Sequence, residues 1–337
     1  MRKTVASAPA LPMSAAMAVG DDLLGNLPHG ERIRSRRMKG DIASIIADAT
    51  GLSEHQRKAV EQELRAAALA IPGVRDARVA LTAADPGRRL IAVGSGKGGV
   101  GKSTVAANLA VALARMGHKV GMIDADIYGP SLPTLLGSDA KPTAEDDRLI
   151  PVAAHGLKFL SLGQLVSPGH ALAWRGPMAT GALARLVEAD WGDAELLIVD
   201  LPPGTGDVQL SLIQKSRPAG AVIVSTPQDL SLIDARRAVD LFNKTAVPVL
   251  GLIENMATYA CPHCGGLSHP FGSGGAEAAA VEMNLPFLGR LPLSPAIREA
   301  SDAGQPPAAA DDPDGLAFAD IARRLIEQLD TAGPPRI

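Results

Sequence analysis

A glycine-rich run at residues 96–104 has the residue types and spacing of a phosphate-binding loop. It reads Gly-Lys-Gly-Gly-Val-Gly-Lys-Ser-Thr and fits the pattern G-x-x-x-x-G-K-[ST]. Glycines let successive backbone N–H groups converge on phosphate oxygens, and a helix that starts at the loop adds its positive end. We expect Lys102 to reach the β- and γ-phosphates of a nucleotide and the Ser103 hydroxyl to ligate Mg²⁺. The candidate nucleotide-binding residues of the loop are Gly96, Lys97, Gly98, Gly99, Val100, Gly101, Lys102, Ser103 and Thr104.

Aspartates at the ends of two later apolar runs can complete a hydrolysis site. Asp124 and Asp126 stand at the end of the run 119–124, and Asp200 follows four apolar residues, 196–199. The position of Asp200 is that of a carboxylate that holds the Mg²⁺ shell through water. A carboxylate near the γ-phosphate can position the attacking water. The alternative for each aspartate is a cap on a helix or turn.

The two cysteines of the chain, Cys261 and Cys264, form a C-x-x-C inside residues 258–272. Structural zinc takes four ligands, and a [4Fe–4S] cluster usually takes four thiolates. Two ways of completing the set of four ligands are therefore possible. Either His263 or His269 completes a site within one chain, or two copies contribute a C-x-x-C each across a two-fold axis. A redox dithiol is disfavoured because the thioredoxin context is missing.

Composition excludes several other classes of protein. Aromatic residues make up 3% and the net charge is −3, so neither base-stacking platforms nor a basic phosphate-binding surface is expected, and nucleic acid is not a predicted partner. No apolar run reaches the roughly 18 residues of a membrane span. Pro9 and Pro12 interrupt the weak likeness of the first residues to a signal peptide. Two cysteines exclude a secreted disulfide scaffold and favour a cytoplasmic location.

The elements that must position these residues begin at residue 90. Short apolar runs rich in β-branched residues alternate with helical patterns, and strands this apolar are buried on both faces. The sequence therefore predicts an α/β fold over residues 90–330, a doubly wound and mainly parallel sheet with helices on both faces. Ligands of such sheets bind beyond the carboxyl ends of the strands, where the motifs fall. The expected strands are 90–95, 119–124, 157–163, 195–202, 220–227, 247–255 and 286–292, and the expected helices are 103–116, 178–189, 207–216, 231–243, 275–283 and 313–329.

The part of the chain before residue 90 gives a weaker signal. Residues 1–40 mix Ala, Pro, Gly and charged residues without sustained periodicity, which predicts a disordered tail or a frayed helix. Residues 54–70 have a helical pattern and residues 75–83 alternate like a strand. A helix and one strand are too small for a convincing core of their own.

The early lysine, Lys97, makes the glycine-rich loop resemble the deviant Walker A group, which includes MinD, ParA, the nitrogenase iron protein and the Mrp/ApbC-type proteins. Over residues 90–310 the chain resembles the Mrp/ApbC-type iron–sulfur cluster carriers most specifically. The residues that carry this resemblance are 174–178, 200–207, 225–228, 254–256, 261–265, 271–272, 288–289 and 292–293.

The resemblance implies a role for several side chains of the nucleotide site. Lys97 would contact phosphate on the partner subunit of a nucleotide-sandwich homodimer. Asp126 would position the attacking water, with Asp124 nearby in the same switch segment. Asn255 would recognise the adenine base, although an asparagine after a strand is also a common turn residue. With Lys102, these residues would make a slow Mg²⁺-dependent ATPase.

For the cysteines, the resemblance implies that Cys261 and Cys264 hold a labile [4Fe–4S] cluster between subunits and that the cluster is passed to apo iron–sulfur proteins. Residues 41–84 would be the remnant of an N-terminal MIP18-type domain whose earlier part is degenerate or absent. Two other functions remain open, a positioning ATPase like MinD or ParA and a zinc-stabilised nucleotide-binding protein without a cluster. The first would need an amphipathic membrane helix or a basic surface, neither of which the sequence offers clearly.

Overall fold

The computed structural model describes residues 24, 27–49, 54–82, 88–126, 129–146, 148–165 and 176–332. The chain separates into two compact units, residues 1–87 and 88–337. Most of the predicted tail, residues 1–23, lies outside the described residues, as does the start of the 174–178 motif.

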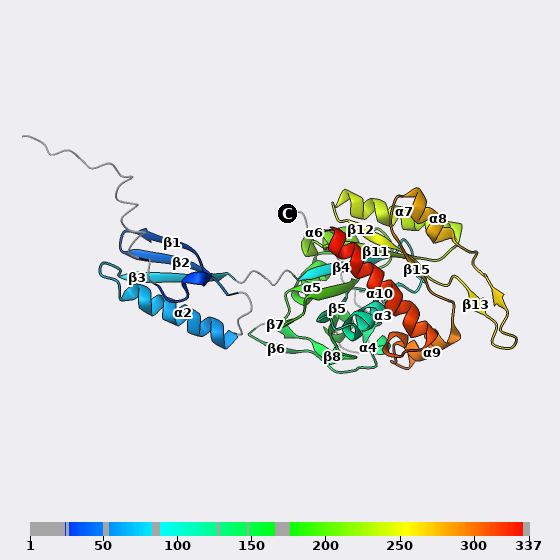
Figure 1. Ribbon diagram of the computed structural model, residues 1–337, viewed down its shortest axis with the longest axis horizontal. Helices are drawn as coiled ribbons and strands as arrows, with labels where there is room; N and C mark the ends of the chain where they lie inside the picture. The colour runs from blue at the N-terminus through cyan, green and yellow to red at the C-terminus, as the bar shows by residue number, and fades with distance from the viewer. Residues whose placement is uncertain are drawn as a thin grey trace, which may run out of the picture. The chain divides into compact units, whose positions relative to one another are not determined.

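The first unit is a small sheet covered by one helix. Strand β1 (Ile33–Lys39) pairs antiparallel with β2 (Ile42–Asp48), and β3 (Asp76–Thr82) pairs parallel with β2. A short 3-10 turn, η1 (Gly30–Arg32), precedes β1, and helix α2 (Glu54–Leu69) connects β2 to β3 (Figure 1). The predicted helix over 54–70 and strand over 75–83 are therefore confirmed.

The prediction of a disordered tail over residues 1–40 was wrong for Ile33–Lys39, which forms β1. Arginines fill much of this strand and hide its alternation, but Ile33 and Met38 pack against the buried cluster of the unit. That cluster includes Ile45 of β2 and Leu64 of α2, both almost fully buried. The added hairpin thus gives this unit a hydrophobic core, which the predicted helix and strand could not form alone. Its kinship with a MIP18-type domain stays a prediction.

The described strands of the second unit form an eight-stranded sheet in the order β15-β12-β11-β4-β10-β5-β9-β8. Neighbours pair in parallel, except that β8 runs antiparallel to β9 at one edge. The predicted α/β fold with its mainly parallel sheet is confirmed, and each of the seven predicted strands is present. The strands are β4 (Arg89–Gly94), β5 (Val120–Asp124), β8 (Val152–Ala154), β9 (Leu157–Ser161), β10 (Leu196–Asp200), β11 (Gly220–Ser225), β12 (Val249–Glu254) and β15 (Phe287–Arg290).

Helices cover both faces of this sheet because the side chains of each strand alternate between two cores. In β4, Ile91 and Val93 join the cluster under α3 and α10, whereas Leu90 and Ala92 join the cluster under α5 to α8. Helix α10 runs beside α3 (Figure 1). The helices are α3 (Lys102–Arg115), α4 (Leu132–Leu135), α5 (Gly176–Val187), α6 (Asp207–Ser216), α7 (Asp229–Lys244), α8 (Gly275–Glu282), α9 (Pro295–Asp302) and α10 (Pro313–Ala332), with 3-10 turns η2 (Leu162–Leu165) and η3 (Pro307–Ala309). Across the described part of the chain, no helix has both the length and the apolarity to span a membrane.

Two short hairpins complete the second unit. Strands β6 (Thr143–Glu145) and β7 (Arg148–Ile150) pair antiparallel ahead of β8. Strands β13 (Tyr259–Ala260) and β14 (Leu267–Ser268) pair antiparallel in the connection from β12 to α8, and this hairpin lies at the edge of the unit (Figure 1). It carries both cysteines, and we call it the cysteine hairpin.

Candidate functional site

The glycine-rich loop joins the carboxyl end of β4 to the first turn of α3, where the sequence pattern placed it. Gly99 and Gly101 take the left-handed backbone conformation, with φ of +80° and +81°, which favours glycine. Gly96 is required for a different reason. A Cβ there would lie 2.1 Å from the backbone of Asp234 in α7. Helix α7 therefore presses directly on the start of the loop.

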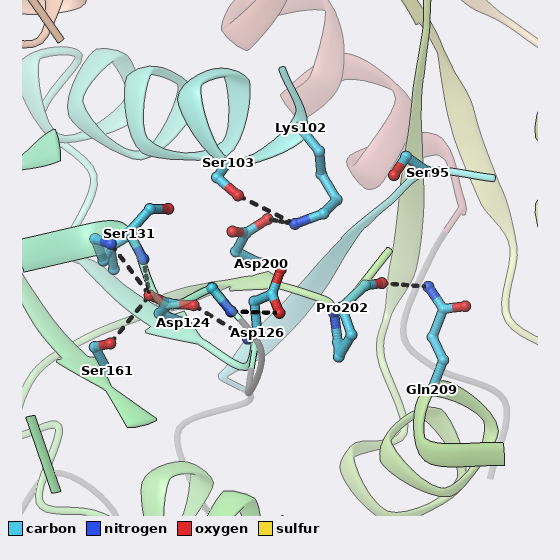
Figure 2. A network of polar contacts seen from close by, with 12 residues as sticks. Ser95, Lys102, Ser103, Asp124, Asp126, Ser131, Ser161, Asp200, Pro202 and Gln209 are labelled. Carbon is cyan, nitrogen blue, oxygen red and sulfur yellow. Dashed lines mark hydrogen bonds and ion pairs between the residues drawn. The ribbon is translucent and has the colours of Figure 1, made fainter. Parts of the chain in front are cut away.

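Lys102 and Asp200 form a buried ion pair at the centre of the site (Figure 2). The Lys102 ammonium donates to Oδ1 of Asp200 and to the Ser103 hydroxyl oxygen, 3.3 Å away. Asp200 ends β10, which lies beside β4, so the sheet brings the carboxylate under the loop. Burial raises the pKa of Asp200, while Lys102 and Ser103 oppose that rise.

The second oxygen of Asp200 fits a role in holding Mg²⁺. Oδ2 is buried and hydrogen-bonds to none of the residues that the structure describes. A buried carboxylate oxygen without a partner is rare and calls for a ligand. Oxygen ligands are those that Mg²⁺ prefers, and the ion commonly keeps several of its waters. With the adjacent Ser103 hydroxyl, Asp200 would hold the hydrated ion.

Asp124 is fully committed to holding the chain that follows β5. Its carboxylate accepts hydrogen bonds from the backbone N–H groups of Asp126, Ser131 and Leu132 at 3.1, 2.9 and 3.1 Å. The hydroxyl of Ser161, at the end of β9, donates to it at 3.0 Å. Figure 2 shows these contacts converging on one carboxylate. Asp124 thus fastens the segment 124–132 to the carboxyl edge of the sheet.

The two aspartates of the 124–126 segment differ in environment. Asp124 is fully buried, and burial followed by repulsion from Asp200 raises its pKa to about 7. Asp126 is half-buried, and its Oδ1 accepts from the N–H of Gly129 at 3.3 Å. The charge of Asp126 also raises the pKa of Asp200, so the two carboxylates lie near each other. Asp126 is therefore the aspartate of this pair that remains partly accessible beside Asp200.

Asn255 lies directly after β12 and hydrogen-bonds to the backbone of the glycine-rich loop. Its side-chain Nδ2 donates to the carbonyl oxygen of Val100 at 2.8 Å, and its backbone N–H donates to Ser225 at 2.8 Å. A Cβ at Gly101 would lie 2.3 Å from Nδ2. The structure thus gives Asn255 a contact with the loop, and recognition of adenine by the same amide stays a prediction.

Lys97 contacts a residue at the start of α7 within its own chain. Its ammonium donates to Oε1 of Gln228 at 3.5 Å, and its carbonyl oxygen accepts from the Ser95 hydroxyl at 2.9 Å. Gln228 stands at the N-cap position of α7. The lysine is half-buried, so a role toward a partner subunit would require it to leave this glutamine.

The cysteine hairpin presents both thiols near its tip. Cys261 is half-exposed and Cys264 is exposed, and neither is in a disulfide. The N–H of Cys261 donates to Gly266 at 3.0 Å and the N–H of Gly265 donates to Cys261 at 2.8 Å, which shapes the turn. Backbone N–H groups of His263 and Cys264 point at the Cys261 sulfur and lower the pKa of that thiol. A thiol with a lowered pKa ionises more readily and is a better metal ligand.

The described residues of one chain do not complete a metal site around these thiols. No three His, Cys, Asp or Glu side chains of the described residues gather at metal-binding distance. The His269 ring is engaged in a hydrogen bond to the backbone instead, since its Nδ1 donates to the carbonyl oxygen of Ala257 at 2.9 Å. The predicted site residues therefore fall into two groups, one around the glycine-rich loop and one on the cysteine hairpin.

Sequence reasoning missed three side chains that organise these groups. Ser161 holds Asp124, Gln228 holds Lys97, and Glu254 holds the return of the cysteine hairpin to α8. Gln228 and Glu254 were part of the motifs that carry the family resemblance but had been given no role. A charged residue that closes an otherwise apolar strand, as Glu254 does, was the available signal.

Known proteins match this chain across the second unit and beyond it. The family model described as the NUBPL iron-transfer P-loop NTPase, within ParA, matches residues 87–328. The chain belongs to this family. The resemblance to iron–sulfur carrier proteins that the motifs indicated is thereby confirmed, and this NUBPL-type chain has the fold of a P-loop ATPase.

Its relatives include proteins named iron–sulfur cluster carrier protein. The one from Deinococcus radiodurans is 45% identical over 312 residues, which is 88% of each chain. The one from Aquifex aeolicus is 41% identical over 316 residues, 92% of this chain and 83% of that protein. The one from Escherichia coli is 50% identical over 222 residues, 65% of this chain and 60% of that protein.

Solved structures agree with this fold. A nucleotide-binding protein from Archaeoglobus fulgidus in complex with ADP has 39% identity and a TM-score of 0.60, covering 68% of this chain and 91% of that one. The cell-division ATPase MinD from Pyrococcus furiosus has 24% identity and a TM-score of 0.55, covering 71% of this chain and 99% of that one. The likeness to MinD concerns the fold alone.

Proposed function

We propose that this NUBPL-type chain is an ATP-hydrolysing carrier that binds a labile [4Fe–4S] cluster between two copies and passes it to apo iron–sulfur proteins. The observation that carries the proposal is the pair of accessible thiols on the cysteine hairpin, Cys261 and Cys264, for which the described part of the chain offers no further ligand. Relatives named iron–sulfur cluster carrier protein support the same function.

The nucleotide half of the cycle uses the glycine-rich loop. Backbone N–H groups of the loop bind the phosphates, and the N-terminus of α3 adds its positive end. Lys102 turns from Asp200 to the β- and γ-phosphates, which leaves Asp200 and Ser103 to hold the water shell of Mg²⁺. Mg²⁺ held by these two residues would neutralise charge on the phosphates. Asp126, partly accessible beside Asp200, holds the water that attacks the γ-phosphate.

Two copies complete the nucleotide site as well as the cluster site. Lys97 leaves Gln228 and contacts the phosphate bound by the partner subunit, supplying a fixed cation for charge that develops during transfer. The weak tether supports this step, because the Lys97–Gln228 distance of 3.5 Å is at the long limit of a hydrogen bond. Homodimerisation on ATP is therefore part of the proposal.

The cluster half of the cycle needs the thiols of both copies. Each hairpin supplies two thiolates, and two hairpins across a two-fold axis supply the four that a [4Fe–4S] cluster usually takes. The lowered pKa of Cys261 favours the thiolate that binds iron. A cluster held at an exposed edge can be transferred to an acceptor without opening either subunit.

Anaerobic reconstitution with iron and sulfide tests this function. We expect about four iron and four sulfide per dimer, and loss of the cluster in Cys261→Ser and in Cys264→Ser. His263→Ala and His269→Ala are the matched controls, since closure within one chain would need one of these rings. A wild-type protein that takes up only zinc, or a cluster that depends on a histidine in a monomer, would contradict the proposal.

We place the protein in the cytoplasm and expect neither membrane nor nucleic acid as a partner. Sedimentation with liposomes and with DNA, each with ATP and without it, tests this part. ATP-dependent binding to either would favour a positioning ATPase instead.

A further inference from the structure

The connection that carries the cysteine hairpin, residues 257–274, begins and ends beside one buried carboxylate. Glu254 is the last residue of β12 and is fully buried. Its Oε1 accepts from the N–H of Gly274 at 3.3 Å, and its Oε2 accepts from the N–H of Ala276 at 2.7 Å. These N–H groups belong to the first turn of α8, where the chain returns from the hairpin. Glu254 therefore fixes the end of the connection to the strand from which it starts.

A surface arginine neutralises this buried charge. Arg290 of β15 donates from Nε to Oε1 of Glu254 at 3.2 Å, and its Nη2 pairs with the exposed Glu277 of α8. Both oxygens of Glu254 are thus occupied by protein donors, so the carboxylate is placed to position backbone rather than to bind a ligand.

The start of the connection is fixed at the same place. The N–H of Leu291 donates to the backbone oxygen of Glu254 at 2.9 Å, and the N–H of Ala257 donates to Leu291 at 3.0 Å. Between Glu254 and Ala257, Met256 takes a left-handed backbone conformation with φ of 60°, which is uncommon for a residue other than glycine. His269 then ties the body of the hairpin back to Ala257 at 2.9 Å. Both ends of the connection are therefore attached to the end of β12.

Asn255, the residue after Glu254, contacts the nucleotide-binding loop. Asn255 donates to the carbonyl oxygen of Val100 at 2.8 Å, and it lies so close to Gly101 that a Cβ at that position would be 2.3 Å from Nδ2. Two consecutive side chains, Glu254 and Asn255, thus join the return of the cysteine hairpin and the phosphate-binding loop. A movement of this loop would therefore be felt at Asn255 and at the backbone that it shares with Glu254.

We propose that Glu254 is a positioning residue that couples the nucleotide-binding loop to the cysteine hairpin, so that nucleotide occupancy changes the exposure of the two thiols. The inference rests on the proposed function, since it assigns the nucleotide to this loop and the cluster to these thiols. It adds the side chain through which one site influences the other. Coupling between two sites in proteins is typically worth 5- to 150-fold.

Alkylation of the thiols in the full-length chain, freed of metal and kept reduced, tests the coupling. The rate of iodoacetamide labelling of Cys261 and Cys264 is measured with no nucleotide and with a non-hydrolysable ATP analogue. In the wild type we expect the analogue to change the rate by roughly fivefold. In Glu254→Gln we expect a ratio within about twofold of one, while the analogue binds with wild-type affinity. Glu277→Gln is the matched control, because it alters the same arginine at the surface, and it should keep the wild-type ratio.

Hydrogen exchange of the wild-type chain provides a measurement that needs no variant. Backbone amides of residues 257–276 should change their exchange rates when the analogue binds. Unchanged exchange there, or a wild-type labelling ratio that persists in Glu254→Gln, would overturn the coupling while leaving the proposed function standing. A wild-type chain that does not bind the analogue would overturn both, whereas correct cluster stoichiometry with no labelling ratio would overturn the coupling alone.

Discussion

Lys102 and Asp200 lie against each other with 6% and 0% of their side chains exposed, at the place where the glycine-rich loop passes over the end of β10. In this structure the lysine that would bind phosphate is neutralised by the carboxylate that would hold Mg²⁺. A buried pair of this kind is costly to break from one side, because the remaining charge has no water to solvate it. In the nucleotide-free chain each of the two residues therefore compensates the buried charge of the other, in addition to its part in the proposed catalysis.

Replacing one partner of this pair should destabilise the chain more than replacing both. We expect Lys102→Met to lower the free energy of unfolding by about 3–5 kcal/mol, because Asp200 stays buried without its cation. The double variant Lys102→Met with Asp200→Asn should lose less than the sum of the single variants. Urea denaturation without nucleotide and with EDTA measures this. Strictly additive losses would show that the pair does not act as a unit.

Replacing Asp126 should slow ATP hydrolysis without weakening ATP binding. We expect Asp126→Asn to slow ATP hydrolysis by roughly 10²- to 10³-fold while ATP affinity stays within about threefold, since the side chain acts on the attacking water. Asp139→Asn, at an exposed aspartate after α4, is the control and should hydrolyse ATP at the wild-type rate. If the Asp126→Asn protein hydrolysed ATP at the wild-type rate, Asp126 would not be the carboxylate that positions the attacking water.

The pKa of Asp124 makes stability depend on pH. The pKa of Asp124 rises from 3.8 in the unfolded chain to about 7 in the folded chain, so the folded chain binds the proton more tightly. The stabilisation that this proton gives the folded chain is complete below about pH 4 and is lost as the pH rises through 7. The loss is on the order of 4 kcal/mol at most, from 1.36 kcal/mol per pKa unit. We expect the free energy of unfolding, measured without nucleotide or Mg²⁺, to fall between about pH 4 and pH 7. Asp124→Asn should be less stable at pH 5 but show a flatter profile, and an equal slope in both proteins would refute this assignment.

Gly96→Ala should damage nucleotide binding through packing rather than through chemistry. The added Cβ meets the Asp234 backbone at 2.1 Å, so the loop or α7 must move, and we expect at least a tenfold loss of ATP affinity, or about 1.4 kcal/mol. Gly181→Ala, in α5 where no atom lies within 4 Å of the new Cβ, is the matched control. Equilibrium binding of a fluorescent ATP analogue compares the two, and equal affinities would contradict the packing argument.

The positions of the residues around the glycine-rich loop could be predicted from sequence because local order determines them. A parallel strand buried on both faces ends in a polar residue at the carboxyl edge of the sheet, so the places of Lys102, Asp124 and Asp200 followed from the apolar runs before them. Their catalytic roles stay predictions. The arginine-rich β1 was missed because its charged side chains obscure the period-2 pattern that the pairing with β2 reveals.

The contacts that distinguish similar residues could not be predicted. Asp124 and Asp126 stand two positions apart in the sequence, and what distinguishes them includes the contact of Asp124 with Ser161, which β9 brings from 37 positions away. Asn255 and Val100 are 155 positions apart. Contacts over such separations depend on the packing of the whole sheet, and the periodicity of neighbouring residues carries no information about them.

The cysteine hairpin pairs two residues on each strand, and within the described residues neither large hydrophobic cluster of the second unit includes a side chain from 258–274. The tip can therefore gain or lose its cargo without breaking a contact inside either hydrophobic cluster. Any influence of the nucleotide on the thiols must then pass through the two ends of this narrow ribbon of backbone, where Glu254 holds the return to α8.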